Sequence, residues 1–199
     1  MSPELKRKIL ATQKLHGWCM LDKAEHLALL VQDATPSKIV EIGVYGGRSL
    51  IPMALAAKTY GGTVYGIDPW SNEACLEGTQ DPANAEWWAK LDIEMIYQCA
   101  VEAVNAFGVA DVVRLMRMRD EEALGYFGDE EIGLLHVDGN HSNEVSRRYV
   151  EQWGPKIEPG GYLVMDDIDW PSQAETVKLI ESQYARVTIK PSWAIYRKE

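Results

Sequence analysis

Residues 39–50, which read IVEIGVYGGRSL, constrain the fold of this chain more than any other segment. A short run of β-branched and apolar residues ends at three closely spaced glycines, and a helical apolar pattern starts at Leu50. This order predicts a strand, a glycine turn and a helix. Glycine permits positive φ and lets a ligand lie against bare backbone. In open α/β sheets, ligands bind at such turns, at the carboxyl ends of the strands.

The glycine spacing argues against two common nucleotide motifs. Gly43, Gly46 and Gly47 do not form G-x-G-x-x-G, and no G-K-[ST] follows them. A second strand is expected at residues 63–67, ending at Asp68. A carboxylate about 20 residues past a glycine turn is placed to hydrogen-bond a ribose diol. A turn without a ligand and an ordinary solvated loop aspartate are the alternative interpretations.

The composition predicts one soluble globular domain. The chain has 199 residues, of which 46% are hydrophobic and 25% charged. Its three cysteines have no C-x-x-C spacing, which indicates a reducing compartment. We expect a cytoplasmic location, since no apolar run reaches the length of a bilayer span and no secretory signal is visible. A net charge of −10 argues against a nucleic-acid partner. Whether the chain forms a homo-oligomer is left open.

The order of predicted elements indicates a Rossmann-like, doubly wound α/β fold. Helical patterns over residues 1–34 predict an N-terminal helical cover over the sheet, and a flap carrying His16 and Trp18 is the alternative. Strands then alternate with helices, which is typical of a mainly parallel sheet. The last two strands are joined by only two residues, so we expect a C-terminal antiparallel hairpin. The seven expected strands are residues 39–42, 63–67, 111–117, 132–137, 162–165, 185–190 and 193–197.

The least regular stretch is residues 69–84, which has the composition of a loop. A loop of this length often acts as a lid or a binding loop. We expect Asn84 to cap one long helix that runs from residue 85 to about residue 107. Trp70, Trp87 and Trp88 are candidate apolar walls, and of the adjacent pair one is expected to face the core.

Three carboxylates follow two buried strands of the predicted sheet. Asp138 ends one strand, and Asp166 and Asp167 end the next. All three are expected at the same sheet edge as Gly43 and Asp68, where unpaired carboxylates repel and lose solvation. A divalent cation removes that cost, and oxygen ligands favour Mg²⁺, with Ca²⁺ or Mn²⁺ as alternatives. The sequence therefore predicts a metal site at this edge.

His141 lies three residues after Asp138, at the start of a predicted helix. A histidine beside an activated hydroxyl is well placed to act as a general base. A helix-capping role and a role as a further metal ligand are the alternatives. His136 lies inside a buried strand, so we expect it to be packed or to support the site from behind.

Four segments together carry a resemblance to a known family: VEIGVYGGRS at 40–49, YGIDPW at 65–70, LHVDGNHS at 135–142 and PGGYLVMDDIDW at 159–170. They resemble the class I S-adenosylmethionine-dependent methyltransferases, and more narrowly the metal-dependent small-molecule O-methyltransferases. Catechol O-methyltransferase is similar in layout, and the macrocin and mycinamicin sugar O-methyltransferases are closer in motif. The resemblance implies a methyltransferase domain over residues 35–199.

The resemblance also implies roles for individual residues. The glycine turn would hold the methionine part of S-adenosylmethionine, Asp68 its ribose, and the loop at 118–120 its adenine. The sugar O-methyltransferases have a histidine base where His141 stands. The implied cofactor-binding residues are Glu41, Gly43, Tyr45, Gly46, Gly47, Ser49, Asp68, Arg119 and Asp120. The implied metal ligands are Asp138, Asp166 and Asp167, with His141 and Asp138 as catalytic residues.

The implied reaction is metal-assisted methyl transfer to a hydroxyl of a small molecule. A vicinal diol or a catechol is favoured, because one metal ion chelates two neighbouring oxygens. A nicotinamide-linked oxidoreductase on the same fold is an alternative, against which the glycine spacing and the terminal hairpin argue. A non-catalytic binding module is a second alternative, against which the presence of His141 and the three aspartates argues.

Overall fold

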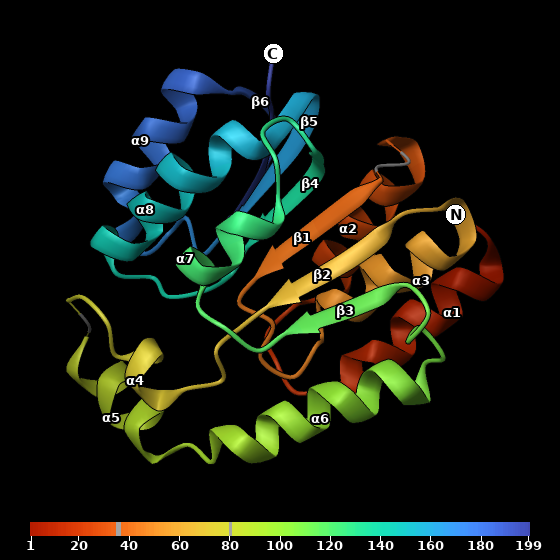
Figure 1. Cartoon of the computed structure of the whole chain (residues 1–199), viewed down its shortest axis with the longest axis horizontal. Helices are drawn as coiled ribbons and strands as arrows, with labels where there is room; N and C mark the ends of the chain where they lie inside the picture. The colour runs from red at the N-terminus through yellow and green to blue at the C-terminus, as the bar shows by residue number, and fades with distance from the viewer. Residues whose placement is uncertain (35–36, 80) are drawn as a thin grey trace.

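A computed structural model describes residues 1–34, 37–79 and 81–199, and within them the strands form one seven-stranded sheet in the order β3-β2-β1-β4-β5-β7-β6 (Figure 1). The strands from β3 to β5 pair in parallel, whereas β7 is antiparallel to both β5 and β6. The predicted Rossmann-like sheet with a C-terminal antiparallel hairpin is therefore confirmed. The strands are β1 (Lys38–Ile42), β2 (Thr63–Ile67), β3 (Val113–Met116), β4 (Ile132–Val137), β5 (Ile157–Asp166), β6 (Ala185–Ile189) and β7 (Trp193–Arg197).

Helices cover both faces of this sheet (Figure 1). One core forms against α1 (Pro3–Ala11), α2 (Leu21–Ala34), α3 (Leu50–Tyr60) and α6 (Ile93–Ala106). The other forms against α7 (Asp120–Ala123), α8 (Asn143–Trp153) and α9 (Ala174–Gln183). Neighbouring strand residues alternate between the two cores, as Ile39 and Val40 show. The short helical turns are Thr12–Lys14, Leu124–Tyr126, Gly154–Lys156 and Pro171–Gln173.

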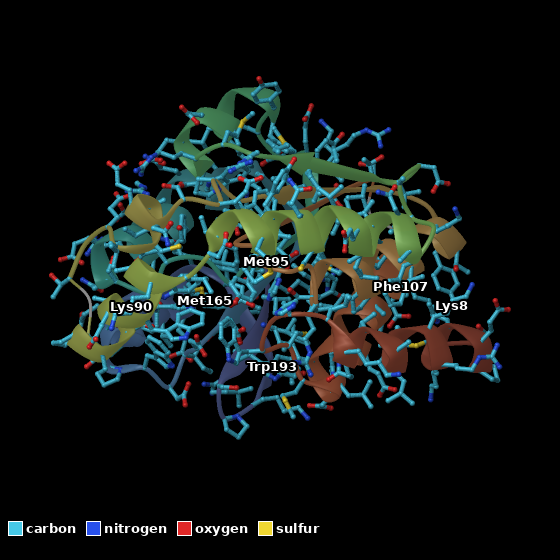
Figure 2. All side chains as sticks on the ribbon, turned by 90° about the horizontal axis from the view of Figure 1, so that it is seen from below. Lys8, Lys90, Met95, Phe107, Met165 and Trp193 are labelled. Atoms are coloured by element: carbon cyan, nitrogen blue, oxygen red, sulfur yellow. The ribbon has the colours of Figure 1, made fainter. Side chains whose placement is uncertain are left out.

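The N-terminal helices are part of the same packed unit as the sheet. Leu5 and Ile9 of α1 share a core with Ile96 and Ala100 of α6. Figure 2 shows side chains filling the space on this side of the sheet, with Lys8 marking α1 and Met95 marking α6. The cover predicted over residues 1–34 thus lies on the sheet, while its expected boundary adjoins residues 35 and 36, outside the described residues.

The long helix predicted over residues 85–107 is wrong, because two helices replace it. The first is α5 (Pro82–Lys90), and α6 begins three residues after it ends. Leu91 is extended after the first helix, and Asp92 caps the second, accepting a hydrogen bond from the amide of Met95 at 3.0 Å. The predicted cap Asn84 is also wrong, since Asp81 caps α5 through the amides of Ala83 and Asn84.

Two further segments are more regular than their composition indicates. The predicted loop at 69–84 contains the short helix α4 (Asn72–Cys75) and the first residues of α5. The predicted turn at 159–161 lies within β5, where the pairing with β4 shifts register and Gly160 has a φ of +79°. Across the described ranges, no helix combines the length and the apolar character that crossing a bilayer requires.

Candidate active site

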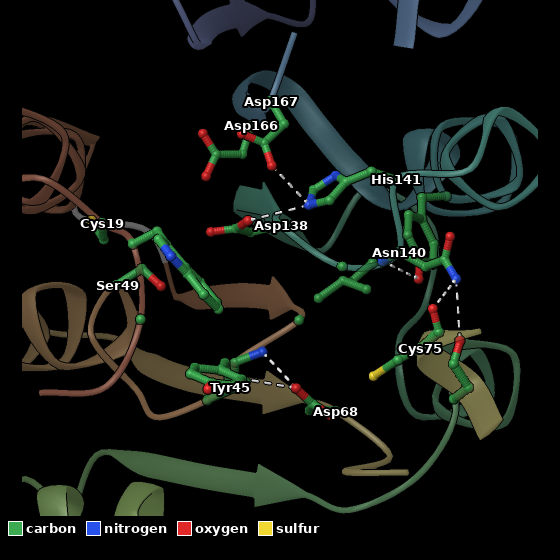
Figure 3. A pocket seen from close by; sticks show the side chains of 18 of the residues that line it. Cys19, Tyr45, Ser49, Asp68, Cys75, Asp138, Asn140, His141, Asp166 and Asp167 are labelled. Carbon is green, nitrogen blue, oxygen red and sulfur yellow. Dashed lines mark hydrogen bonds and ion pairs between the residues drawn. The ribbon is translucent and has the colours of Figure 1, made fainter. Parts of the chain in front are cut away.

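A cavity of about 450 Å³ opens where β1, β2, β4 and β5 end (Figure 3). Gly43, Asp68, Asp138 and Asp166, which follow or end these strands, all line it. The strand order reverses at β1, with β2 and β3 on one side and β4 and β5 on the other, and open α/β folds bind ligands at such a point. The volume lies in the range of about 300–1,000 Å³ found for small-molecule sites.

The glycine turn requires its glycines for reasons of backbone and space. Gly43 has a φ of +86°, and a Cβ there would lie 2.2 Å from the carbonyl oxygen of Asp138. The turn therefore brings the β1 and β4 loops into direct backbone contact. Tyr45 follows with a φ of +51°, a left-handed conformation that is strained for an aromatic residue. Of the residues predicted to bind the cofactor, Gly43, Tyr45 and Ser49 line the cavity.

Asp68 lies against this turn and holds its shape. One carboxylate oxygen accepts hydrogen bonds from the amides of Val44 and Tyr45, both at 3.0 Å (Figure 3). The other accepts from the amide of Trp70 at 2.7 Å. Burial raises the pKa of Asp68, and the three amide hydrogen bonds oppose that effect. The side chain lines the cavity and has one lone pair left for a ligand hydroxyl.

Three residues of the predicted cofactor set do not line the cavity: Glu41, Gly46 and Gly47. Glu41 is fully buried, with its Oε1 2.8 Å from Nδ1 of His136. Gly46 makes room for the N-terminal segment, because a Cβ there would lie 2.5 Å from Cβ of His16. Glu41 and Gly46 therefore pack behind the turn, whereas Gly47 gives the turn a residue with a φ of +85°. The expected packed place of His136 is confirmed.

The adenine end predicted around Arg119 and Asp120 is a cluster of charges at the cavity wall. Glu77 accepts from Arg119 at 2.7 Å and from Arg148 at 2.6 Å, and Arg148 also lies 3.3 Å from Asp120. Burial raises the pKa of Asp120 to about 6. These ion pairs join three segments distant in sequence and give this end of the cavity both charged and hydrogen-bonding groups.

Asn140 holds the region of α4 against the β4 loop. Its side-chain amide donates to the carbonyls of Ala74, Cys75 and Glu77 at 3.2, 3.3 and 2.9 Å (Figure 3). The predicted loop is therefore tied to the strand end that carries Asp138. This residue was absent from the predicted site, although it lies inside the DGNH segment.

The three predicted metal ligands do not converge on one point. In the described residues, their ligand atoms fall into two groups, each with all atoms within 4.8 Å of one another. The inner group is His136, Asp138 and Asp166, and the outer group is Asp138, His141 and Asp167. Asp166 and Asp167 belong to different groups, so Asp138 lies with each of them in turn, and the ligand set of three aspartates stays a prediction.

The inner group already contains a cation, the ammonium of Lys23. This side chain comes from α2, is buried, and lies 3.2 Å from Oδ2 of Asp138 while also contacting Oδ2 of Asp166. Burial acts to lower the pKa of Lys23, but the charges of both aspartates raise it above its ordinary value. Burial likewise acts to raise the pKa of Asp166, and the charge of Lys23 brings it below the usual range.

His141 occupies the outer group. Its Nε2 lies 3.0 Å from Oδ2 of Asp167 and 3.9 Å from Oδ1 of Asp138 (Figure 3). Burial lowers the pKa of His141 to about 4 and raises the pKa of Asp167 to about 6. At neutral pH the imidazole is therefore neutral and has one nitrogen able to accept a proton. Asp167 has a φ of +50°, which directs its carboxylate from the end of β5.

Aromatic rings form one wall of the cavity. Trp18 packs on Tyr45 and on Trp87, with ring centroids 5.0 and 5.5 Å apart, and Trp87 packs on Trp88. Both tryptophans of the adjacent pair line the cavity, so the expectation that one faces the core is wrong. Trp70 is not a wall residue, because it is buried and donates from Nε1 to the carbonyl of Tyr45 at 2.9 Å.

The N-terminal cover thus contributes residues to the site that sequence reasoning missed, namely Lys23, Cys19 and Met20. The N-terminal segment combines features of the two predicted alternatives, since it packs in the core like a cover and lines the cavity like a flap. Lys23 had a detectable signal: it lies four residues before Leu27, on the buried stripe of α2. A lysine on the apolar face of a helix requires a buried counter-charge.

Comparisons with known proteins agree with this fold. A putative O-methyltransferase from Klebsiella pneumoniae superposes with a TM-score of 0.69 at 17% identity, covering 100% of this chain and 91% of its own. TomG from Streptomyces achromogenes, solved in complex with S-adenosylmethionine, gives a TM-score of 0.67 at 16% identity over 100% of this chain and 90% of its own. A Bacillus cereus O-methyltransferase in complex with S-adenosylhomocysteine gives 0.67 at 15% identity, over 100% and 92%.

A relative in sequence is the uncharacterized protein y4gI of Sinorhizobium fredii, which is 30% identical over 142 residues. The match covers 70% of this chain but only 14% of that protein, so the chain spans a small part of this relative's length. A family model described as a methyltransferase domain matches residues 40–168, which include the glycine turn, Asp68, Asp138, His141 and both β5 aspartates. The chain therefore belongs to the methyltransferase-domain family.

Proposed function

We propose that this chain transfers the methyl group of S-adenosylmethionine to a hydroxyl of a small molecule. The observation that carries the proposal is one cavity with a glycine turn and Asp68 at one end and a neutral histidine beside two aspartates at the other. Family membership supports methyl transfer, and similar folds have been solved with this cofactor or its product.

The residues of the cavity suit S-adenosylmethionine. Gly43 lines the cavity without a side chain, Asp68 offers its remaining acceptor site to a ribose hydroxyl, and Arg119 and Asp120 bound the adenine end. When bound, the cofactor supplies an electrophilic methyl group on a sulfonium. The protein then has to orient and deprotonate the acceptor rather than form a covalent intermediate.

His141 is the group able to deprotonate the acceptor. The contact of Nε2 with Asp167 leaves Nδ1 of the neutral ring as the proton acceptor. Asp167 holds the ring in place and stabilises the imidazolium that forms, as a carboxylate does in other histidine-based sites. The negative charge of Asp166 favours the protonated ring, although burial outweighs it, while burial and the charge of Asp166 raise the pKa of Asp138 well above its ordinary value.

Replacing Asp68 with asparagine should weaken cofactor binding. The asparagine side chain would bring N–H donors to a place where the backbone amides of Val44, Tyr45 and Trp70 now donate to the carboxylate. We expect the affinity for S-adenosylhomocysteine to fall about tenfold to a hundredfold, measured by calorimetry. Asp111→Asn is the matched control, since Asp111 pairs with Lys58 at the surface and should leave the affinity unchanged. Unchanged affinity in Asp68→Asn would remove Asp68 from the proposed site.

Metal-assisted transfer to a vicinal diol or catechol is a second candidate, favoured by the outer group. Asp138, His141 and Asp167 offer three ligand atoms, and Mg²⁺ held there would polarise acceptor oxygens. The residues fit an ion only at this group, because Lys23 contacts Asp138 and Asp166 in the inner one. In this form His141 is a ligand, and its role as a free base is lost.

Removing divalent ions distinguishes the two candidates. For the metal-assisted form, chelation with EDTA should abolish methylation of a catechol, and added Mg²⁺ should restore it, because the ion supplies the Lewis acid. The measurement is product formation with and without chelator on the same protein. A rate indifferent to EDTA would reject metal assistance and leave methyl transfer with His141 as the base.

A further inference from the structure

Lys23 is an unusual component of an acidic site. It is 2% exposed and lies on the buried face of α2. From this N-terminal helix it contacts aspartates at the ends of β4 and β5. A lysine side chain is seldom buried unless it is paired. Here both pairs are with carboxylates that the sequence had assigned to a metal ion.

The two contacts are made to carboxylate oxygens of two of the three residues in the inner group. Lys23 donates to Oδ2 of Asp138 and to Oδ2 of Asp166. Over residues 1–34, 37–79 and 81–199, no other lysine or arginine forms an ion pair with either aspartate. An ammonium and a divalent cation repel, and both require these lone pairs, so the two exclude each other at this position.

One more basic group, His136, lies beside the inner pair of aspartates. Nε2 of His136 lies 4.0 Å from Oδ2 of Asp138, on the side of the buried Glu41–His136 pair. Asp167 contacts His141 at 3.0 Å and feels the charge of Lys23 only at a longer distance. One positive charge therefore serves the inner group, while the outer group stays open to the cavity.

We propose that Lys23 is a built-in cation that takes the inner metal position, holding Asp138 and Asp166 in place without an ion. Any divalent ion is then confined to the outer group, where Asp166 is not a ligand. In the reaction, which rests on the proposed function, Lys23 is a positioning residue that fixes the charge and place of Asp138 behind His141. The N-terminal cover thereby becomes a necessary part of the site.

The test measures Mn²⁺ binding by the electron paramagnetic resonance of free Mn²⁺, which needs no turnover. In the wild type, Asp166→Asn should change Mn²⁺ affinity less than about threefold, and Asp167→Asn should weaken any binding about tenfold or more. Lys23→Met keeps the stem of the side chain and removes the charge. It should gain an Mn²⁺ site at least about tenfold tighter than the wild type, and adding Asp166→Asn should abolish that gain.

Thermal unfolding gives a second readout. Mn²⁺ should raise the Tm of Lys23→Met clearly more than that of the wild type, because the ion replaces the lost charge. Lys190→Met is the matched control, since Lys190 pairs with Asp22 beside α2 and lies outside both groups. It should behave as the wild type in both measurements.

Two results would overturn the proposal. One is tight Mn²⁺ binding by the wild type that Asp166→Asn weakens tenfold or more, and the other is folded Lys23→Met without gain of Mn²⁺ affinity. If Lys23→Met yields no folded protein, the effect of Asp166→Asn in the presence of Lys23 decides alone. Failure of the wild type to bind S-adenosylhomocysteine would reject the proposed function and leave these metal titrations interpretable.

Discussion

Replacing His141 with alanine should lower kcat/KM for methyl transfer about 10²- to 10⁴-fold, the usual contribution of a positioned general base. The reason is geometric, because His141 faces Asp138 and Asp167 at the cavity wall and is neutral at working pH. The affinity for S-adenosylhomocysteine should change little, since the glycine turn and Asp68 lie at the other end of the cavity. Initial rates and calorimetry on the same preparation measure the two quantities.

His26→Ala is the matched control for this substitution. His26 lies on the same N-terminal helix as Lys23 but is partly exposed, with Nδ1 2.7 Å from the carbonyl of Asp22 and no place in the cavity wall. It should retain wild-type rates. A His141→Ala variant with undiminished kcat/KM, or one that loses cofactor affinity in proportion to rate, would show that His141 is not the base.

Gly43→Ala should destabilise the protein by roughly 3 kcal/mol or more, through backbone strain and a backbone collision together. The new Cβ would lie 2.2 Å from the carbonyl oxygen of Asp138 and 2.5 Å from Cα of Gly139. Both atoms belong to the backbone, so no side-chain rotation relieves the contact. The β1 and β4 loops must separate, and cofactor binding should be lost with them. Urea unfolding and calorimetry measure the two losses.

Gly108→Ala separates the two causes. Gly108 has a φ of +65°, but a Cβ there meets nothing within 4 Å. The substitution should lower the free energy of unfolding only by the cost of the left-handed conformation, about 1–2 kcal/mol. Equal destabilisation of the two variants would mean that the turn yields easily and that the close approach of Gly43 to Asp138 is not a requirement of the fold.

The arrangement of strands was readable from the sequence because each strand has its own local signal. Residues 132–137 and 193–197 are apolar runs between turn residues, and the structure has these strands with the same bounds. The join of α5 and α6 was not readable in the same way. Asp92 lies among helix-compatible residues, and its capping role emerges only when its carboxylate turns to the amide of Met95.

The site was readable at the strand ends and less so elsewhere. Carboxyl ends of parallel strands meet at one edge, so the neighbourhood of Gly43, Asp68 and Asp138 follows from their positions. Glu41 precedes the glycine turn, but its side chain points into the core, because side chains along a strand alternate between the two faces. There it contacts His136. Lys23 contacts Asp138 and Asp166, which lie far from it in the sequence, and no local pattern predicts which residues it will contact.

The two alternative functions, an oxidoreductase and a non-catalytic binding module, are opposed by different observations. Membership of the methyltransferase-domain family, together with the confirmed hairpin, argues against a nicotinamide-linked oxidoreductase. A binding module without turnover has the same fold, and the His141→Ala comparison separates it from an enzyme. Trp18 and Trp87 give the cavity an apolar wall beside Tyr45.

The most direct test of the central claim is a calorimetric titration of S-adenosylhomocysteine into the wild-type protein, with NADH titrated in parallel. We predict saturable binding of one S-adenosylhomocysteine per chain, with a Kd between about 1 μM and 1 mM, the usual range of substrate affinity, and no binding of NADH. Absence of saturable binding of S-adenosylhomocysteine, repeated with S-adenosylmethionine, would contradict the account of this cavity as the site of a methyl-transfer reaction.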